Sequence, residues 1–115
     1  MTKFQTKRIY DEPSETDGYR VLVDRLWPRG VSKERADLNE WAKEIAPSTE
    51  LREWFGHDPA KFKEFAARYV EEIKQNPEAP AVIARWRAHQ VVTLLYGARN
   101  EADNEAVVLH RYLEK

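Results

Sequence analysis

The chain has 115 residues, which is enough for one folded domain with a single core and too few for a separate substrate-binding domain. Its 19 basic and 20 acidic residues nearly cancel, so the overall charge favours neither nucleic acid nor a membrane surface as a partner. The absence of cysteine excludes disulfides, thiolate metal sites and cysteine nucleophiles, and no apolar run reaches signal-peptide or membrane-spanning length, so we expect a cytoplasmic protein without a membrane partner.

The first quarter of the chain predicts two strands. Lys7–Tyr10 is a short candidate for the first strand, and the polar turn 11–18 leads from it into the second. Val21–Val23 is an unbroken apolar run, which is typical of a strand covered on both faces, because successive side chains point to opposite sides. We therefore expect a central strand there. Charged and aromatic side chains follow it directly, namely Asp24, Arg25, Trp27 and Arg29.

The segment that follows the central strand is harder to assign. Residues 31–37 read as a charged connection containing a turn of helix capped by Ser32. In residues 40–46, Trp41, Ala42 and Ile45 fit one face of a helix, whereas Trp41, Lys43 and Ile45 fit the alternation of a strand. Helix propensity slightly favours the helix, and Pro47 ends either element.

Three helices are predicted between residues 48 and 88. Ser48 or Thr49 can cap a short helix that runs through Phe55 and ends at Gly56. Asp58 and Pro59 can start a longer helix that ends at Asn76 and Pro77. A third helix can run from Pro80 to Ala88, with Ile83 and Trp86 facing inward. The longer helix carries one aromatic and apolar stripe, formed by Phe62, Phe65, Ala66, Tyr69 and Ile73.

The end of the chain predicts a strand and a helix. Val91–Tyr96 has no polar face, and a loop from Gly97 to Asn100 separates it from a helix over about 104–113. Two all-apolar strands separated by helices indicate a parallel sheet. We therefore expect one α/β domain over residues 1–115, a small sheet of three or four mainly parallel strands flanked by helices.

The ends of the two apolar strands suggest an anion site. If the strands are parallel, their carboxyl ends lie side by side, and Arg25, Arg29 and Arg99 could converge there, with Trp27 or Tyr96 as a flat wall. Guanidinium groups match carboxylate and phosphate oxygens in geometry. The alternative is a structural ion pair of Arg25 with Asp24 at the rim of the sheet.

Other chemistry has weaker support in the sequence. Asp24 could act as an acid or base with the hydroxyl of Tyr96 or Ser48, although a structural carboxylate is the more common case. No metal site is predicted, because the three histidines lie far apart and share no ligand spacing. Tryptophans and arginines could bind nucleic acid, but no basic stripe favours it.

The sequence resembles the YeaO-like branch of the domain of unknown function 488 family. The residues that carry the resemblance are Asp17–Gly30 with Val-Asp-Arg-Leu-Trp-Pro-Arg-Gly, Trp41–Ser48 with Leu51, Arg52 and Phe55, and Leu94–Tyr96 with Ala98 and Asn104. The resemblance implies a small α/β domain in which 41–45 is a strand and Ser48 joins Arg25, Arg29 and Tyr96 on one rim. Other branches carry a cysteine and a Cys-His-Arg word in the last loop, which this chain lacks, so thiol chemistry is not expected to carry over.

We therefore expect a protein that binds an anionic small ligand, such as a nucleotide or a phosphorylated metabolite, at the carboxyl edge of the sheet. Whether it also acts as a hydrolase or transferase is left open, and the sequence names no cofactor. The alternative is a non-catalytic interaction module for protein or nucleic acid, using Trp27, Pro28 and Trp54, and the chain could be a monomer or a homodimer. The expected ligand-binding residues are Arg25, Trp27, Arg29, Lys43, Ser48, Tyr96 and Asn104, with Asp24 orienting the arginines.

Overall fold

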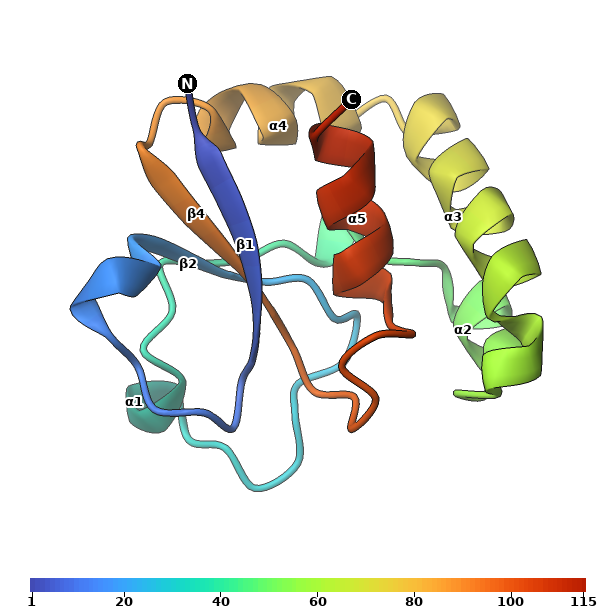
Figure 1. Ribbon diagram of the computed structural model, residues 1–115, viewed down its shortest axis with the longest axis horizontal. Helices are drawn as coiled ribbons and strands as arrows, with labels where there is room; N and C mark the ends of the chain where they lie inside the picture. Colours follow the sequence, from blue (N-terminus) through green and yellow to red (C-terminus); the bar gives the residue numbers. More distant parts are fainter.

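A four-stranded parallel sheet forms the centre of the computed structural model, which describes residues 1–115 (Figure 1). The strand order is β1-β4-β2-β3, and every pairing in the sheet is parallel. This confirms the predicted α/β fold and the parallel arrangement of the two apolar strands, which lie side by side. The strands are β1 (Lys3–Arg8), β2 (Tyr19–Leu22), β3 (Glu40–Trp41) and β4 (Val91–Tyr96).

Most helices begin and end close to the bounds that the capping residues predicted. The side chains of Ser32, Ser48 and Asn104 cap α1, α2 and α5, and Gly56 ends α2 in the left-handed conformation at φ 52°. Asp58 caps a short 3-10 turn that leads into α3. No helix combines the length and apolar character needed to cross a membrane. The helices are α1 (Lys33–Ala36), α2 (Thr49–Phe55), α3 (Phe62–Gln75), α4 (Ala79–Trp86) and α5 (Glu105–Leu113).

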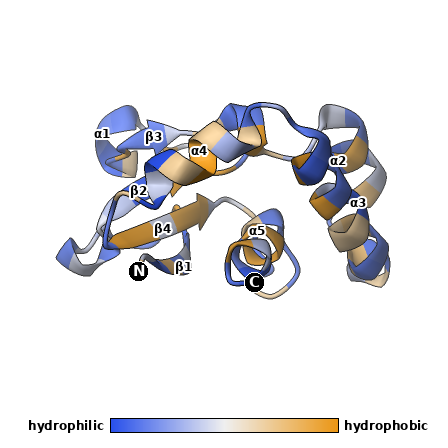
Figure 2. Ribbon diagram, turned by 90° about the horizontal axis from the view of Figure 1, so that it is seen from above, coloured by the Kyte–Doolittle hydropathy of each residue, from blue (hydrophilic) through white to orange (hydrophobic).

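Apolar side chains cover both faces of the sheet, which explains the unbroken apolar run of the central strand. Val21 and Val23 point into the larger core, which α2 to α5 complete, with Trp86 and Tyr69 fully buried in it. Leu22 points to the opposite face, into a smaller cluster closed by residues of α1 and its flanking loops. β4 is hydrophobic over most of its length and lies between these two layers (Figure 2).

Two strand predictions need correction. The first strand runs over Lys3–Arg8 instead of Lys7–Tyr10, because it pairs along the whole of β4, from Lys3 opposite Val91 to Arg8 opposite Tyr96. As an edge strand it carries several polar side chains, which weaken its sequence pattern.

The second correction concerns the strand expected at 41–45. Only Glu40 and Trp41 form β3, because its partner β2 ends at Leu22, and residues 43–45 form a 3-10 turn. That turn drives the Ile45 side chain into the larger core, and the Ile45 carbonyl accepts a 2.7 Å hydrogen bond from the Tyr69 hydroxyl of α3.

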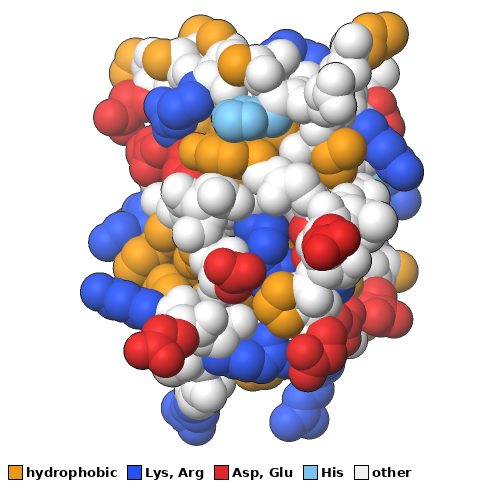
Figure 3. All heavy atoms as spheres, turned by 90° about the vertical axis from the view of Figure 1, so that its left-hand side faces the viewer, with side chains coloured by type: hydrophobic (Ala, Val, Ile, Leu, Met, Phe, Trp, Pro, Cys, Tyr) orange, Lys and Arg blue, Asp and Glu red, His pale blue; other side chains and the backbone are white.

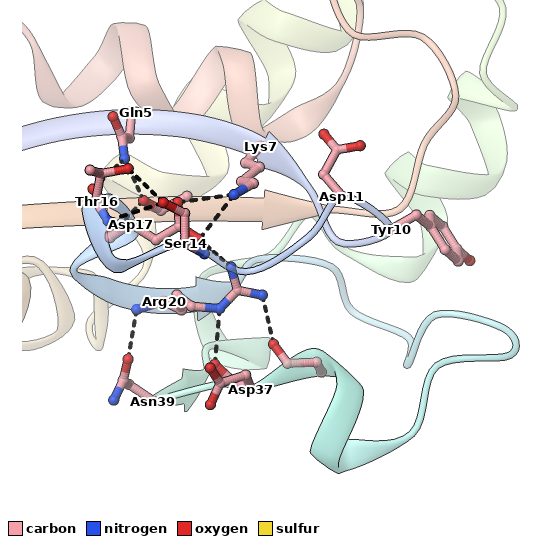
Figure 4. A network of polar contacts seen from close by, with 12 residues as sticks. Gln5, Lys7, Tyr10, Asp11, Ser14, Thr16, Asp17, Arg20, Asp37 and Asn39 are labelled. Atoms are coloured by element: carbon pink, nitrogen blue, oxygen red, sulfur yellow. Dashed lines mark hydrogen bonds and ion pairs between the residues drawn. The ribbon is translucent and has the colours of Figure 1, made fainter.

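A buried ionic network ties the loop before β2 to the face covered by α1 (Figure 4). Asp17 accepts hydrogen bonds from Arg20 at 2.6 Å and from Lys7 at 3.1 Å, and Arg20 also donates to the carbonyls of Ala36 and Asp37. Burial opposes ionisation of Asp17, but the hydrogen bonds from the Ser14 backbone, Lys7 and Arg20 outweigh it and lower the pKa of Asp17. The network is therefore a satisfied structural ion cluster at the amino end of the sheet.

Candidate functional site

A pocket of about 550 Å³ lies at the carboxyl ends of β2 and β4, where the sequence predicted a site. Most of its lining comes from the loop after β2, the end of α2 with the turn that follows it, the loop after β4, and the first turn of α5, and Tyr10, Pro47 and Phe65 complete it. In Figure 1 the strands point away from α4, so this pocket is at the end of the sheet opposite α4. The position is the one at which open α/β sheets bind ligands.

Asp24 is anchored on this edge by the backbone of the neighbouring strand. Val23 donates to the Leu95 carbonyl, and one residue later the Asp24 Oδ2 accepts a 2.9 Å hydrogen bond from the Gly97 amide. A Cβ at position 97 would lie only 3.1 Å from Oδ2, so glycine allows this close approach. The carboxylate of Asp24 therefore has a defined position in the pocket wall.

Glu105 brings a second carboxyl group to the pocket. It occupies the first turn of α5, directly after the capping residue Asn104, and it lines the same pocket as Asp24. Burial, followed by the negative charge of Asp24, raises the pKa of Glu105 well above its usual range, and the charge of Arg52 opposes this effect. The surroundings of Glu105 therefore favour the neutral form of its carboxyl group.

Three arginines face the same pocket. Arg25 is held by the backbone, since its Nε donates to the Pro47 carbonyl at 2.7 Å and a terminal nitrogen donates to the Ala46 carbonyl at 3.2 Å. Arg29 and Arg52 line the pocket from the loop after β2 and from α2. None of the ion pairs of the chain involves these three residues. Their guanidinium groups are therefore not neutralised by a direct ion pair.

Aromatic and apolar side chains complete the pocket. Trp27 is fixed by a 2.6 Å hydrogen bond from its indole nitrogen to the Val31 carbonyl and by edge-on contact with Trp41. Tyr10 and Leu26 also line the pocket and are exposed. Trp27 therefore occupies the wall position that the sequence analysis expected of it.

Four of the residues expected to bind the ligand lie outside the pocket. The Lys43 ammonium stacks over the Trp41 ring at 4.1 Å, and Ser48 caps α2 while its hydroxyl donates to Glu72. Tyr96 is buried in the larger core, since it points to the same side of β4 as Leu94. Asn104 is fully buried and caps α5, where it also donates to the Asn100 carbonyl. Arg99, which was expected to converge with the other arginines, is likewise not among the lining residues.

Arg52, His57 and Glu105 are lining residues that were not among the expected ligand-binding residues. Arg52 belongs to a helix whose bounds were predicted, and Glu105 follows a predicted helix cap. The sequence signal for Arg52 was therefore its place in the predicted helix before Gly56, and the signal for Glu105 was its place at the start of the last predicted helix. Which helix ends meet the strand ends depends on tertiary packing, which no local pattern contains.

On one face of the molecule the charges are mixed (Figure 3). On the face seen in Figure 3, basic and acidic side chains alternate without an extended patch of one sign. A surface of this kind offers no continuous track for a phosphate backbone.

Comparisons with known proteins place the chain among close relatives. A family model described as "Inactive DUF488-N3 subclade" matches residues 3–115. The chain is 45% identical over 109 residues to "Uncharacterized protein YeaO" of Escherichia coli (strain K12), covering 95% of each chain. It is 41% identical over 112 residues to "Uncharacterized protein Rv3073c" of Mycobacterium tuberculosis (strain ATCC 25618 / H37Rv), covering 97% of this chain and 94% of that one. No solved structure matches the chain.

Proposed function

This chain belongs to the DUF488 family, in its YeaO-like branch, and we propose that the pocket at the carboxyl edge of its sheet binds a small anionic ligand, such as a nucleotide or a phosphorylated metabolite. The observation that carries the proposal is the pair Arg29 and Arg52. The two residues come from different elements and line one pocket, and neither of them forms an ion pair with a carboxylate. Planar guanidinium donors of this kind suit phosphate and carboxylate oxygens.

The surroundings of the arginines support binding of an anion. Three arginines and three carboxyl groups line this pocket, and burial together with the charge of Asp24 raises the pKa of Glu105, which favours its neutral form. The pocket volume of about 550 Å³ falls within the range of small-molecule sites. Gly97 and Ala98 stand in the loop where the resemblance places a cysteine in other branches. The proposal is therefore one of ligand binding without a thiol nucleophile, in keeping with the word "inactive" in the description of the matching subclade.

The interaction-module alternative has less support. Of its three residues, Pro28 is buried, and the indole of Trp27 is committed to the Val31 carbonyl. Trp54 is only partly exposed and lies beside Lys61 and Arg68. These contacts leave no continuous apolar surface made by the three residues, so we rank this function second.

A thermal-shift screen tests the proposed function. Inorganic phosphate, nucleoside mono- and triphosphates and sugar phosphates are added to the wild type and to Arg29→Ala, Arg52→Ala and Arg99→Ala. A ligand that binds only the folded protein stabilises it by about 2.7 kcal/mol at 100 times its Kd, so a binding probe raises the Tm of the wild type. We expect this rise to shrink in the first two variants and to persist in Arg99→Ala, because Arg99 lies outside the pocket. A wild type that responds to none of the probes, or equal responses in all four proteins, would overturn the proposal.

A further inference from the structure

We propose that the ligand of this pocket carries an aromatic ring next to its anionic group, and that Tyr10 and Leu26 bind that ring. The inference rests on the proposed function and adds the chemical class of the ligand. Apart from the amino-terminal Met1, Tyr10 and Leu26 are the large hydrophobic side chains that the fold leaves exposed, at 39% and 57%. Both of them line the pocket that Arg29 and Arg52 line.

Tyr10 reaches the pocket because β1 ends at the same edge of the sheet as β2 and β4. Arg8 pairs with Tyr96 at the end of the parallel strands, and the Ile9 amide continues this pairing by donating to the Tyr96 carbonyl. Tyr10 follows, and in Figure 4 its side chain points away from the ionic network of Asp17, beyond the end of β1. A Cβ at position 97 would lie 4.0 Å from Cε2 of the Tyr10 ring, so the ring packs against the loop after β4.

The Tyr10 side chain is held beside the backbone of Arg29. Its hydroxyl donates a 3.0 Å hydrogen bond to the Arg29 carbonyl, and its own carbonyl accepts a 2.8 Å hydrogen bond from Arg35. The Arg8 guanidinium lies over the ring, 5.0 Å from its centre, but Arg8 is not among the lining residues. The ring therefore meets the pocket with a part that Arg8 leaves uncovered. A ring fixed in this way loses little conformational freedom when a ligand binds to it.

The exposed apolar side chains and the arginines suit two parts of one ligand. A single exposed leucine is common in proteins, but here Leu26 and Tyr10 line one concave site that three arginines also line. The arginines match an anionic group, and an apolar ring would remove both exposed side chains from water. Tyr10 adds an edge-on or offset-stacked contact that favours an aromatic ring over a saturated one. The proposed ligand therefore joins an aromatic ring, such as a nucleobase, to a phosphate or carboxylate group.

Three phosphate esters of matched charge separate the ring from the anionic group. Methyl phosphate has no ring, cyclohexyl phosphate has a saturated ring, and phenyl phosphate has an aromatic one. At about pH 8 all three are dianions, because the second pKa of a phosphate ester is about 6. Each ester is titrated into the full chain, and ¹H–¹⁵N spectra follow the amides of Gly56 and Gly97, which line the pocket. We expect phenyl phosphate to bind about tenfold more tightly than methyl phosphate, and more tightly than cyclohexyl phosphate.

Variants of the two side chains test which groups contact the ring. Tyr10→Leu removes the aromatic ring and should abolish the advantage of phenyl over cyclohexyl phosphate, whereas Tyr10→Phe keeps the ring and should retain it. Leu26 is too exposed to support the core, so Leu26→Ala leaves the fold intact and should weaken phenyl phosphate more than methyl phosphate. Tyr112→Leu is the matched control, because Tyr112 is a partly buried tyrosine of α5 outside the pocket, and it should behave like the wild type.

The outcomes separate this inference from the proposed function. If the wild type binds phenyl phosphate no more tightly than methyl phosphate, or no more tightly than cyclohexyl phosphate, the inference alone is overturned. An advantage of the aromatic ring that persists in Tyr10→Leu, or disappears in Tyr112→Leu, overturns the assignment to Tyr10, and equal weakening of both esters in Leu26→Ala overturns the role of Leu26. Failure of all three esters to shift either glycine amide, together with a flat thermal-shift screen, overturns the proposed function as well.

Discussion

Replacing Asp17 by Asn should remove a large part of the stability of the fold. Asp17 is 3% exposed and Arg20 4%, and the distance between their charged groups is 2.6 Å. Asn keeps the shape of the side chain but leaves the buried Arg20 charge with neutral acceptors only, among them the carbonyls of Ala36 and Asp37 (Figure 4). Breaking a buried ion pair by removing one partner costs about 3–5 kcal/mol. Since small domains are stable by only about 5–15 kcal/mol, the variant should be far less stable than the wild type.

Urea unfolding followed by circular dichroism measures this loss. With an m-value of about 2 kcal/mol/M, the midpoint should fall by about 1.5–2.5 M. Glu64→Gln is the matched control, because Glu64 and Arg68 form an ion pair that is about half exposed on α3, and such pairs contribute about 0.5 kcal/mol or less. If Asp17→Asn unfolds within 0.3 M of the control, a shift of about 0.6 kcal/mol or less at that m-value, the network does not stabilise the fold as reasoned.

The pH dependence gives a second check on Asp17. Its hydrogen bonds lower its pKa below the ordinary value, so the unfolded chain binds the proton more readily than the folded one. The stability that Asp17 contributes is therefore present above its ordinary pKa and is lost as the pH falls through the folded pKa. Wild type and Asp17→Asn should differ most at neutral pH and converge in acid, and a difference that grows in acid would contradict this assignment.

Two further predictions concern stability elsewhere in the chain. Burial and the charge of Asp24 raise the pKa of Glu105, so the wild type should lose stability as the pH rises from the ordinary glutamate pKa through the pKa in the folded protein. Glu105→Gln should not show this loss. Urea midpoints of the two proteins that run parallel between pH 5 and 9 would refute the prediction. Gly18→Ala should cost more than about 1 kcal/mol in thermal melting, because Gly18 has φ 62° and a Cβ there would lie 2.5 Å from the Val91 carbonyl oxygen. Gly30→Ala should cost less, since Gly30 shares the positive φ but has no atom within 4 Å, and equal losses would exclude the clash as the cause.

The sequence predicted best those elements that have one strong local signal. Val91–Tyr96 was assigned with its observed bounds, because a run without polar residues ends at a glycine loop. The bounds of α2 followed from a serine cap and a left-handed glycine. The edge strands β1 and β3 were misplaced, since an edge strand is held by its neighbour's backbone and needs no apolar pattern of its own.

The site was predictable where it continues a strand. Four lining residues directly follow the central strand, namely Asp24, Arg25, Trp27 and Arg29. The fold class alone was therefore enough to predict that they lie at the carboxyl edge of the sheet. The burial of Tyr96 was also within reach, because side chains alternate along a strand and residue 96 shares the face of the apolar residues 92 and 94. The side chains contributed by helices required the packing of α2 and α5 against the sheet, which the periodicity of a single helix does not determine.

The presence of Asp24 and Glu105 in one pocket is an argument for a role in binding. A carboxyl group whose pKa is raised by burial and by a neighbouring carboxylate makes the folded state less stable at neutral pH than a neutral side chain would. Glutamine at position 105 would preserve the size of the side chain without that cost. The Gly97 amide already satisfies Asp24, and Asn104 already caps α5, so neither the sheet nor the helix needs the second acid. Local destabilisation of this kind is common where a protein keeps a group for function, and here it lies in the same pocket as three arginines without ion-pair partners.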